Sequence, residues 1–346
     1  MDFSLLKKLT DTPGVSGREE RVREVVKGQL SRITGEDVVI DSLGNLIGHL
    51  PGPGPCVALI AHMDEVGFLV SKIEQDGFIR VLPAGGIDRR VFWAQKVIVH
   101  GRKDLPGVVG SVPPHLSGPE GKEAEKAVPI EDCFIDLGLP AKEVMELTKI
   151  GDPVTFATES WETETTLFAK ALDDRVGLFV MIESVRRSEK IDCELFLIAS
   201  TQEEYGLRGV GPAVYSVKPE IALALEGTVS CDTPGLKLPA NLTPTVQGKG
   251  PEIRLTDRRM ISSRALADFL DRIAEEGGIP HQVIAKKMGA TDAAVGQITG
   301  PGLSACAIAV PARYIHAPAG LVLKADVEFT VALVTRFLEH ASRFRA

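Results

Sequence analysis

Four short apolar segments constrain the fold of this chain more than any other feature of its sequence. Each segment is strand-sized and lacks the alternation of apolar and polar residues that a half-exposed strand shows. Such segments are typical of strands buried on both faces, in a parallel or mixed sheet with helices on both sides. Helical stretches lie between them, and strands that alternate with helices indicate an α/β fold. The apolar segments are 56–61, 195–199, 221–225 and 305–310, and the helical stretches are 175–187, 259–276 and 325–342.

Residues from about 70 to 160 show a different pattern, with short β-type segments at close spacing and Gly and Pro between them. This pattern is typical of a small β-barrel or sandwich. Two short helices are expected within it, near 120–126 and 141–147. We therefore expect a discontinuous α/β domain, residues 1–69 and 161–346, that carries an inserted β-rich domain, residues 70–160.

The N-terminal region predicts a helix that runs to about Leu30, with Ser16 or Gly17 as its N-terminal cap. Apolar residues recur there with the period of a helix. A strand hairpin is expected next, between 38–40 and 45–48.

The composition argues against several classes of protein. The 346 residues include 39 Lys and Arg against 47 Asp and Glu, a formal charge of −8, so a basic face for nucleic acid or anionic membrane is not expected. No apolar run approaches the roughly 20 residues that span a bilayer, and no signal-peptide pattern opens the chain. Five scattered cysteines without a Cys-x-x-Cys pair fit a reducing compartment. We expect a cytoplasmic protein without nucleic-acid or membrane partners.

Metal-type ligands follow the four apolar segments. In open α/β sheets, ligands bind at the carboxyl ends of the strands, so these side chains are expected to converge in one crevice. Two imidazoles and several carboxylates suit two divalent ions, zinc or cobalt, and one carboxylate can bridge the pair. The candidates are His62, Glu203, Glu204, Glu226 and His316, with Asp173 at the entry to a helix as a further one.

Each candidate could also be an ordinary side chain with no role in metal binding. His62 differs from an ordinary histidine because Asp64 follows two residues later, on the same side of an extended chain. Asp64 can therefore accept a hydrogen bond from the second imidazole nitrogen, as carboxylates beside metal ligands do. A lone histidine is usually a satisfied or solvated side chain, and that interpretation is assigned to His49, His100, His281 and His340.

The acidic pairs also have two interpretations. Glu203 and Glu204 are either a solvated pair in a loop or a pair that acts in catalysis. They directly follow a strand and are flanked by glycines. In the second case one carboxylate holds a metal and the other accepts a proton from water. Asp173 and Asp174 could cap a helix N-terminus, which explains Asp174 well and Asp173 only partly.

Five stretches occur in order along the chain and together resemble one family. They read AHMDEVGF (61–68), ALDDRVG (171–177), TQEEYGLRG (201–209), GATDA (289–293) and RYIHAP (313–318). The family is that of the tetrahedral (TET) aminopeptidases, or glutamyl aminopeptidases, which are metallopeptidases with two metal ions. Some members carry the name endoglucanase. Within the expected insert, residues 113–116 and 133–138 also resemble the family.

The resemblance implies a role for each ligand. His62 and Glu226 would share one ion, Glu204 and His316 would hold the other, and Asp173 would bridge the two. The family often has Asp where this chain has Glu226, and Glu presents the same carboxylate on a longer side chain.

The resemblance also implies a mechanism, a fold and partners. Glu203 would be the general base and later the proton donor to the leaving amine, and Asp64 would orient the histidine ligand. The fold would be a phosphorylase/hydrolase-like αβα sandwich with an inserted PDZ-like or barrel-like domain. Peptides would be the substrates, and the chain would form homo-oligomers, as dimers that assemble into a tetrahedral dodecamer. His115, in the insert, is taken as a structural residue rather than part of a neighbour's active site.

Three hypotheses about function follow. The first is an aminopeptidase with two metal ions. The second is a glycoside hydrolase, suggested by the paired glutamates. It is weakened because glycosidase carboxylates flank the scissile bond about 5 to 9.5 Å apart and because aromatic residues, which stack on sugars, make up only 5% of the chain. The third is a metal-binding assembly protein without catalysis.

Overall fold

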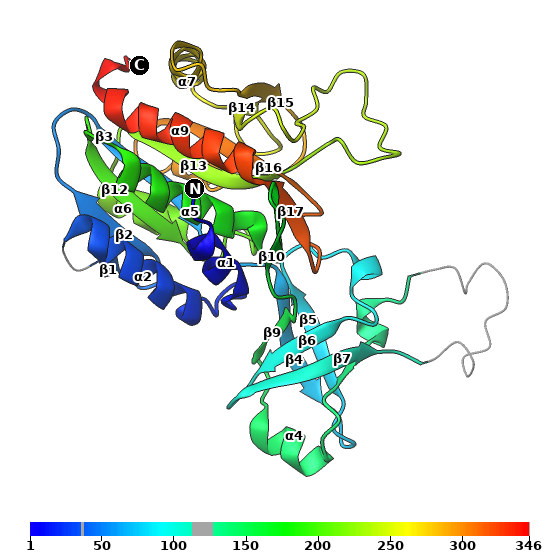
Figure 1. Cartoon of the computed structure of the whole chain (residues 1–346). Helices are drawn as coiled ribbons and strands as arrows, with labels where there is room; N and C mark the ends of the chain where they lie inside the picture. Colours follow the sequence, from blue (N-terminus) through cyan, green and yellow to red (C-terminus); the bar gives the residue numbers. More distant parts are fainter. Residues whose placement is uncertain (36–37, 113–126, 346) are drawn as a thin grey trace.

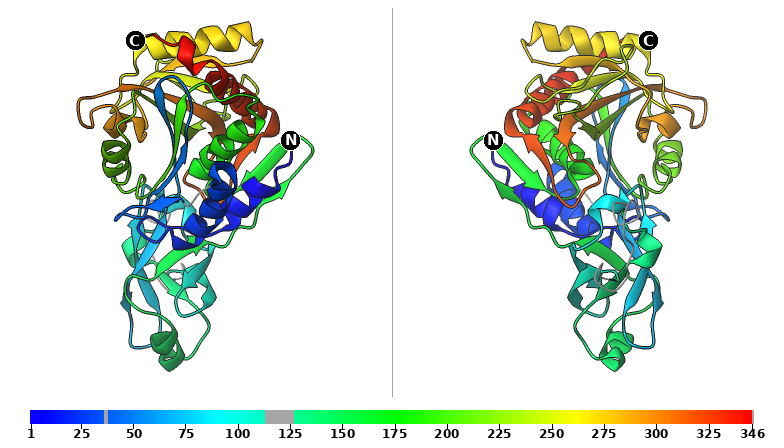
Figure 2. Two further views of the ribbon diagram at one scale, coloured as in Figure 1. Left: turned by 90° about the vertical axis from the view of Figure 1, so that its left-hand side faces the viewer. Right: turned by 90° about the vertical axis from the view of Figure 1, so that its right-hand side faces the viewer.

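The computed structural model describes residues 1–35, 38–112 and 127–345. It contains a large mixed sheet flanked by helices and a smaller closed β-barrel that extends from one end of it (Figure 1). The side views show the barrel projecting away from the helices of the larger part (Figure 2). The expected α/β fold with an inserted β-rich part is confirmed, and of the two forms expected for the insert the barrel is the one found.

The centre of the large sheet is parallel. Strands run in the order β1-β2-β12-β3-β13-β16-β17-β11-β10, and the neighbours β12, β3, β13 and β16 are parallel to one another. The carboxyl ends of these four strands therefore lie along one edge of the sheet. The bounds are β1 Val39–Ile40, β2 Leu46–Leu50, β3 Cys56–His62, β10 Trp161–Glu162, β11 Thr166–Ala169, β12 Glu194–Ser200, β13 Ile221–Val229, β14 Glu252–Thr256, β15 Gln282–Ala285, β16 Ser304–Arg313 and β17 Gly320–Leu323.

Alternate residues of the central strands enter two different cores. In β3, Val57 and Leu59 belong to the larger core, whereas Ala58 and Ile60 belong to the core on the opposite face. The larger core includes residues of α1, α2, α5, α7 and α9, and the smaller one includes residues of α6 and α8. Both faces of the sheet are thus covered, which explains the continuous apolar runs in the sequence.

The helix bounds correct two expectations. The first long helix begins at Glu20, with Glu19 in the N-cap position. Ser16 does not cap this helix, because its hydroxyl donates to the carboxylate of Asp64. The helix expected from residue 259 begins only at Arg264, where the Ser263 hydroxyl accepts from Leu266 N. The bounds are α1 Ser4–Asp11, α2 Glu20–Thr34, α4 Ala141–Leu147, α5 Leu172–Arg187, α6 Val210–Val217, α7 Arg264–Glu276, α8 Ala293–Gly296 and α9 Lys324–His340.

The barrel closes through six strands in the order β4-β5-β8-β7-β6-β9, with β9 pairing back to β4. Its interior is an apolar cluster that includes Phe68, Phe92 and Phe156. Short 3₁₀ helices, η1 Arg89–Val91 and η2 Ile130–Asp132, join its strands, and η3 Ala341–Arg343 follows α9. The strand bounds are β4 Gly67–Ile73, β5 Ile79–Ala84, β6 Lys96–His100, β7 Asp104–Gly110, β8 Phe134–Asp136 and β9 Pro153–Phe156.

The first barrel strand begins at Gly67, three residues before the predicted boundary at 70, and the division into domains at 70 and 160 stays a prediction. The helix expected at 141–147 is α4. The helix expected near 120–126, and His115 with its neighbours, lie outside the described residues. Among the described residues, no helix combines the length and the apolar character that crossing a membrane requires.

Two helical glycines provide a matched test of this packing. A Cβ at Gly177 in α5 would meet the backbone oxygen of Leu225 and the carboxylate of Asp174, whereas a Cβ at Gly28 in α2 has nothing within 4 Å. We expect Gly177→Ala to lower the free energy of unfolding by about 1–3 kcal/mol through overpacking. Gly28→Ala should raise it by roughly 0.5–1 kcal/mol, because alanine favours the helix. Urea denaturation measures both, and equal stability of the two variants would contradict the packing.

Candidate metal centre

The site lies where the four parallel strands of the central sheet end. His62 is the last residue of β3, and the two glutamates follow β12 by three and four residues. Glu226 is inside β13 rather than after it, since that strand continues to Val229. The structure brings all six predicted ligand or base residues to this edge: His62, Asp173, Glu203, Glu204, Glu226 and His316.

Asp173 lies between the two histidines. Its Oδ1 is 3.2 Å from His62 Nε2, and its Oδ2 is 3.5 Å from His316 Nε2. One carboxylate thus presents an oxygen to each imidazole, which is the geometry of a bridging ligand.

The other ring nitrogen of each histidine is held by a backbone carbonyl. His62 Nδ1 donates to the backbone oxygen of Asp64 at 3.1 Å, and His316 Nδ1 donates to that of Gly86 at 2.8 Å. In the neutral form of each imidazole these bonds place the proton on Nδ1, so that Nε2 carries the lone pair that can bind a cation.

The three glutamates surround this axis. Glu204 Oε1 is 3.0 Å from His316 Nε2. Glu203 Oε2 and Glu226 Oε2 are each 3.9 Å from His62 Nε2. Glu203 and Glu226 are buried, so a compact acidic cluster shielded from water faces two imidazoles.

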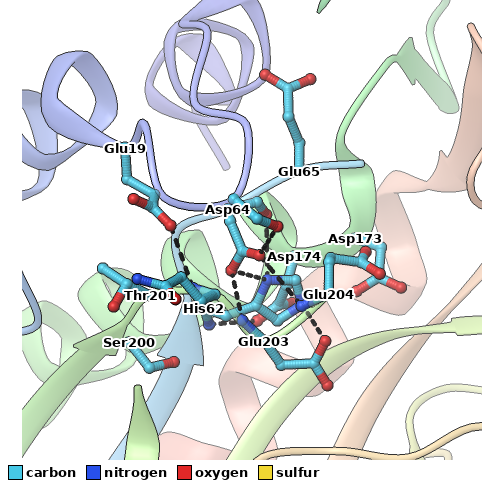
Figure 3. A network of polar contacts seen from close by, with 12 residues as sticks. Glu19, His62, Asp64, Glu65, Asp173, Asp174, Ser200, Thr201, Glu203 and Glu204 are labelled. Atoms are coloured by element: carbon cyan, nitrogen blue, oxygen red, sulfur yellow. Dashed lines mark hydrogen bonds and ion pairs between the residues drawn. The ribbon is translucent and has the colours of Figure 1, made fainter. Parts of the chain in front are cut away.

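The carboxylate of Asp64 organises the backbone of this cluster (Figure 3). Its Oδ1 accepts from Glu203 N at 2.9 Å and lies 3.3 Å from His62 Nδ1. Its Oδ2 accepts from Glu204 N at 3.1 Å and from the Ser16 hydroxyl at 2.5 Å. Asp64 is fully buried, and these contacts fix the turn that carries both glutamates relative to the histidine.

Two residues at the site were missed by the sequence analysis. Ser16 was read only as a helix cap, and Glu19 was not singled out. Glu19 Oε1 accepts from Gly17 N at 2.7 Å and from Gln202 N at 3.1 Å, so the N-terminal loop also holds the turn after β12. Burial and the charge of Asp64 raise the pKa of Glu19 to about 7. Neither residue belongs to a periodic pattern, and their partners Asp64 and Gln202 lie 48 and 183 positions away along the chain.

Asp174 has the capping role that the sequence favoured. Its Oδ1 accepts from Gly177 N at 3.0 Å at the start of α5, and its Oδ2 accepts from His62 N at 3.1 Å. It also forms a second group with His62 and Glu226 whose ligand atoms lie within 4.8 Å of one another.

The backbone near the site adopts unusual conformations. Ala171, Gln202 and His316 have φ of 52°, 55° and 59°, in the left-handed region that residues with a Cβ rarely occupy. Such residues cluster where a fold holds side chains in a required orientation. Each of these three lies within two residues of a candidate ligand or base.

The charges at the site favour a bound cation. Burial lowers the pKa of His316, but Asp173 and Glu204 outweigh it and raise the pKa to about 11. Burial and the neighbouring carboxylates raise the pKa values of Glu203 and Glu226 well above the ordinary range. Several carboxylates compete for too little positive charge here, and a cation would relieve their repulsion.

The residues fit divalent ions. His62, Asp173 and Glu204 can each offer one ligand atom, with all three atoms within 4.8 Å of one another. The buried Glu204 Oε1 has one polar neighbour among the described residues, the His316 Nε2 atom at 3.0 Å. Nitrogen and oxygen donors of this kind suit zinc or a similar ion.

The other described histidines have partners away from the site, with one exception. The interpretation as satisfied side chains is confirmed for three of them, whereas the buried Nδ1 of His340 has no hydrogen-bond partner among the described residues. His49 pairs with Glu194, His100 with Asp104 and Thr155, and His281 with Asp271.

A cavity of about 760 Å³ opens onto the candidate ligands. Asp173, Glu203, Glu204 and Glu226 are among the residues that line it, so a positively charged group of a ligand would meet negative charge there. The volume lies within the range typical of small-ligand sites.

Comparison with known proteins gives consistent matches along the chain. The profile of the M42 glutamyl aminopeptidase family matches residues 44–333. The lysyl aminopeptidase of Pyrococcus furiosus is 35% identical over 345 residues, which cover 98% of this chain and 97% of that protein. An aminopeptidase from the archaeon Desulfurococcus kamchatkensis superposes with a TM-score of 0.91 at 35% identity, covering 98% of this chain and 94% of the other. The TET1 peptidase of Pyrococcus horikoshii, described as assembling into a tetrahedron or a large octahedral shell, gives 0.83 at 32% identity, covering 97% and 98%.

The contacts of Asp64 generate a prediction. Asp64→Asn keeps the shape of the side chain but replaces one acceptor oxygen with a donor, so it cannot serve all the donors that converge there. We expect the affinity for Zn²⁺ or Co²⁺ to fall roughly 10- to 100-fold, as measured by calorimetric titration of the metal-free protein. Asp11→Asn, on the exposed end of α1, is the control and should bind metal as the unaltered chain does. Unchanged affinity in Asp64→Asn would contradict a positioning role.

Proposed function

The chain belongs to the M42 glutamyl aminopeptidase family, and from that premise we propose that it uses two metal ions to remove the N-terminal residue from peptides. Family membership makes the chain a peptide hydrolase. The observation that carries the two-metal proposal is the position of Asp173, whose two carboxylate oxygens lie 3.2 and 3.5 Å from two different imidazoles.

The proposed ligand sets are those that the resemblance to the family implies. His62 and Glu226 would hold one ion, and His316 and Glu204 would hold the other, with Asp173 between them. Zinc or cobalt suits such mixed nitrogen and oxygen donors. When bound, the ions supply Lewis acidity, which acidifies water and polarises the peptide carbonyl.

Glu203 is the proposed general base. Its neighbour Glu204 points at His316, whereas Glu203 Oε2 is 3.9 Å from His62 and is free of a ligand role in this scheme. Glu203 would accept a proton from the attacking water and then donate it to the amine that leaves. The bond from its backbone N to Asp64 holds it at the site.

The carboxylates of the candidate ligands would set the position of cleavage. A free α-amino group is positively charged and is attracted to these carboxylates, which line the cavity. A peptide bond inside a chain has no such charge nearby. The proposed reaction is therefore removal of one residue at a time from the N-terminus.

The proposal includes an assembly and a compartment. We propose that the chain forms homo-oligomers built from dimers, supported by its likeness to the TET1 peptidase of P. horikoshii, which is described as forming a tetrahedron or an octahedral shell. A cytoplasmic location is proposed from the composition, in which cysteines are few and scattered.

Replacing each of the two adjacent glutamates in turn tests their roles. Glu203→Gln removes the proton acceptor but keeps the proposed ligands, so we expect kcat to fall about 10²- to 10⁴-fold with the metal content unchanged. The matched variant Glu204→Gln should lose activity together with one ion. Metal analysis and peptide hydrolysis, measured on the same preparations, separate the outcomes. Near-normal turnover by Glu203→Gln would contradict the mechanism.

Metal removal tests the activity itself. After chelation and dialysis, we expect no release from a panel of aminoacyl anilides, because the ions that polarise the carbonyl are absent. Added Zn²⁺ or Co²⁺ should restore hydrolysis. Cleavage that persists without metal would reject a metal-dependent reaction. Release of reducing sugar from a glucan, insensitive to the chelator, would instead favour a glycoside hydrolase, and inactivity on the whole panel with metal supplied would favour a non-catalytic assembly protein.

A further inference from the structure

Two buried threonines, Thr228 and Thr245, line the cavity together with the candidate ligands. Both contact a buried group of charges formed by Glu252, Arg254 and Lys286. Arg254 Nε donates to Glu252 Oε1 at 2.6 Å, and Lys286 Nζ lies 2.9 Å from the same oxygen. The two threonine side chains are therefore held by the same network of ion pairs and hydrogen bonds.

The two hydroxyl groups play opposite parts in this network. Thr245 donates its proton to the carboxylate of Glu252. Thr228 Oγ1 instead accepts from Lys286 Nζ at 2.5 Å and from Arg254 Nη2 at 3.2 Å. An ammonium group and a guanidinium group can only donate, so both lone pairs of the Thr228 oxygen are occupied and its proton must point elsewhere. The residues that the structure describes provide no acceptor for that proton.

The Thr228 donor lies close to one of the proposed metal ligands. Thr228 follows Glu226 by two residues on β13, and both residues line the cavity. Residues two apart on a strand lie on the same face, about 7 Å apart along it. Two cations that donate to the Thr228 oxygen also polarise its O–H bond, which strengthens the hydrogen bond that the hydroxyl can donate. The cavity thus offers an unused, polarised donor beside the candidate ligands.

We propose that the Thr228 hydroxyl donates a hydrogen bond to a backbone carbonyl oxygen of the bound peptide, that of the residue after the scissile bond. This inference rests on the aminopeptidase function proposed above, in which the scissile carbonyl lies at the ions. Backbone carbonyl oxygens are acceptors that every peptide substrate offers. The next carbonyl is one residue further along the substrate, at most about 3.6 Å of extended chain, which the spacing between Glu226 and Thr228 accommodates. Thr228 is then a substrate-binding residue of the cavity.

The test compares two substrates on the metal-loaded full-length protein. Both begin with the residue that the unaltered protein releases fastest from the panel of anilides. In the tripeptide this residue is followed by Gly-Gly, which supplies the second carbonyl oxygen. In the p-nitroanilide the scissile carbonyl is the only one on the backbone, so the proposed acceptor is absent.

Thr228→Val keeps the shape of the side chain and removes the hydroxyl. We expect its KM for the tripeptide to rise roughly tenfold, the effect of losing one good hydrogen bond. Its kcat should change less than about twofold, because the bond is present in the bound substrate and in the transition state alike. For the anilide, kcat/KM should stay within about twofold of the unaltered protein.

Thr245→Val is the matched control, because it removes a hydroxyl from the same network and the same cavity whose proton is already donated to Glu252. It should leave the ratio of kcat/KM for tripeptide and anilide unchanged. Thr228→Ser restores the hydroxyl and should recover most of the affinity for the tripeptide. Metal analysis and thermal unfolding of each variant report the state of the site and of the fold independently of both substrates.

Three results would overturn the inference. The first is an equal loss on tripeptide and anilide in Thr228→Val, which would assign the hydroxyl a structural role in the network. The second is the same selective loss on the tripeptide in Thr245→Val. The third is a Thr228→Ser variant as impaired on the tripeptide as Thr228→Val. Failure of the unaltered protein to cleave either substrate would instead overturn the proposed aminopeptidase function, and that result is obtained before any variant is compared.

Discussion

The buried carboxylate of Asp64 is the interaction on which the metal centre depends. It joins three parts of the chain that are far apart in sequence: the N-terminal loop through Ser16, the end of β3 through His62, and the turn after β12 through the backbone of Glu203 and Glu204. A fully buried charge is unfavourable unless every acceptor site is used. The burial that makes Asp64 costly therefore also makes its partners obligatory, and the alignment of the candidate base and ligands follows from that requirement.

The sequence predicted the elements whose pattern is local. Apolar runs indicated the central strands, the residues that follow these runs were predicted as metal ligands, and the proximity of His62 and Asp64 was predicted from their spacing. The contacts of Ser16 and Glu19 were beyond it, because these polar loop residues meet partners 48 and 183 positions away along the chain. One helix start was also misplaced, because Ser16 donates to Asp64 instead of capping the helix. The periodicity of apolar residues indicates which side chains are buried, but it does not indicate which distant residue a polar side chain contacts.

Buried carboxylates lie close together at the site and repel one another. Glu203, Glu204 and Glu226 share a region shielded from water, and burial raises the pKa of each of them. The fold keeps them together through backbone hydrogen bonds and through a sheet whose parallel strands end at one edge. The stability of the surrounding sheet thus maintains an arrangement that the side chains alone would not adopt.

The hydrogen bond from His316 to Gly86 makes the barrel part of the metal centre. Gly86 lies in the loop between β5 and η1, so the tautomer of one imidazole is set by a peptide group of the inserted part. The two parts of the molecule are for this reason chemically inseparable, although each has its own hydrophobic core. A displacement of the barrel would therefore move the carbonyl oxygen that orients this imidazole.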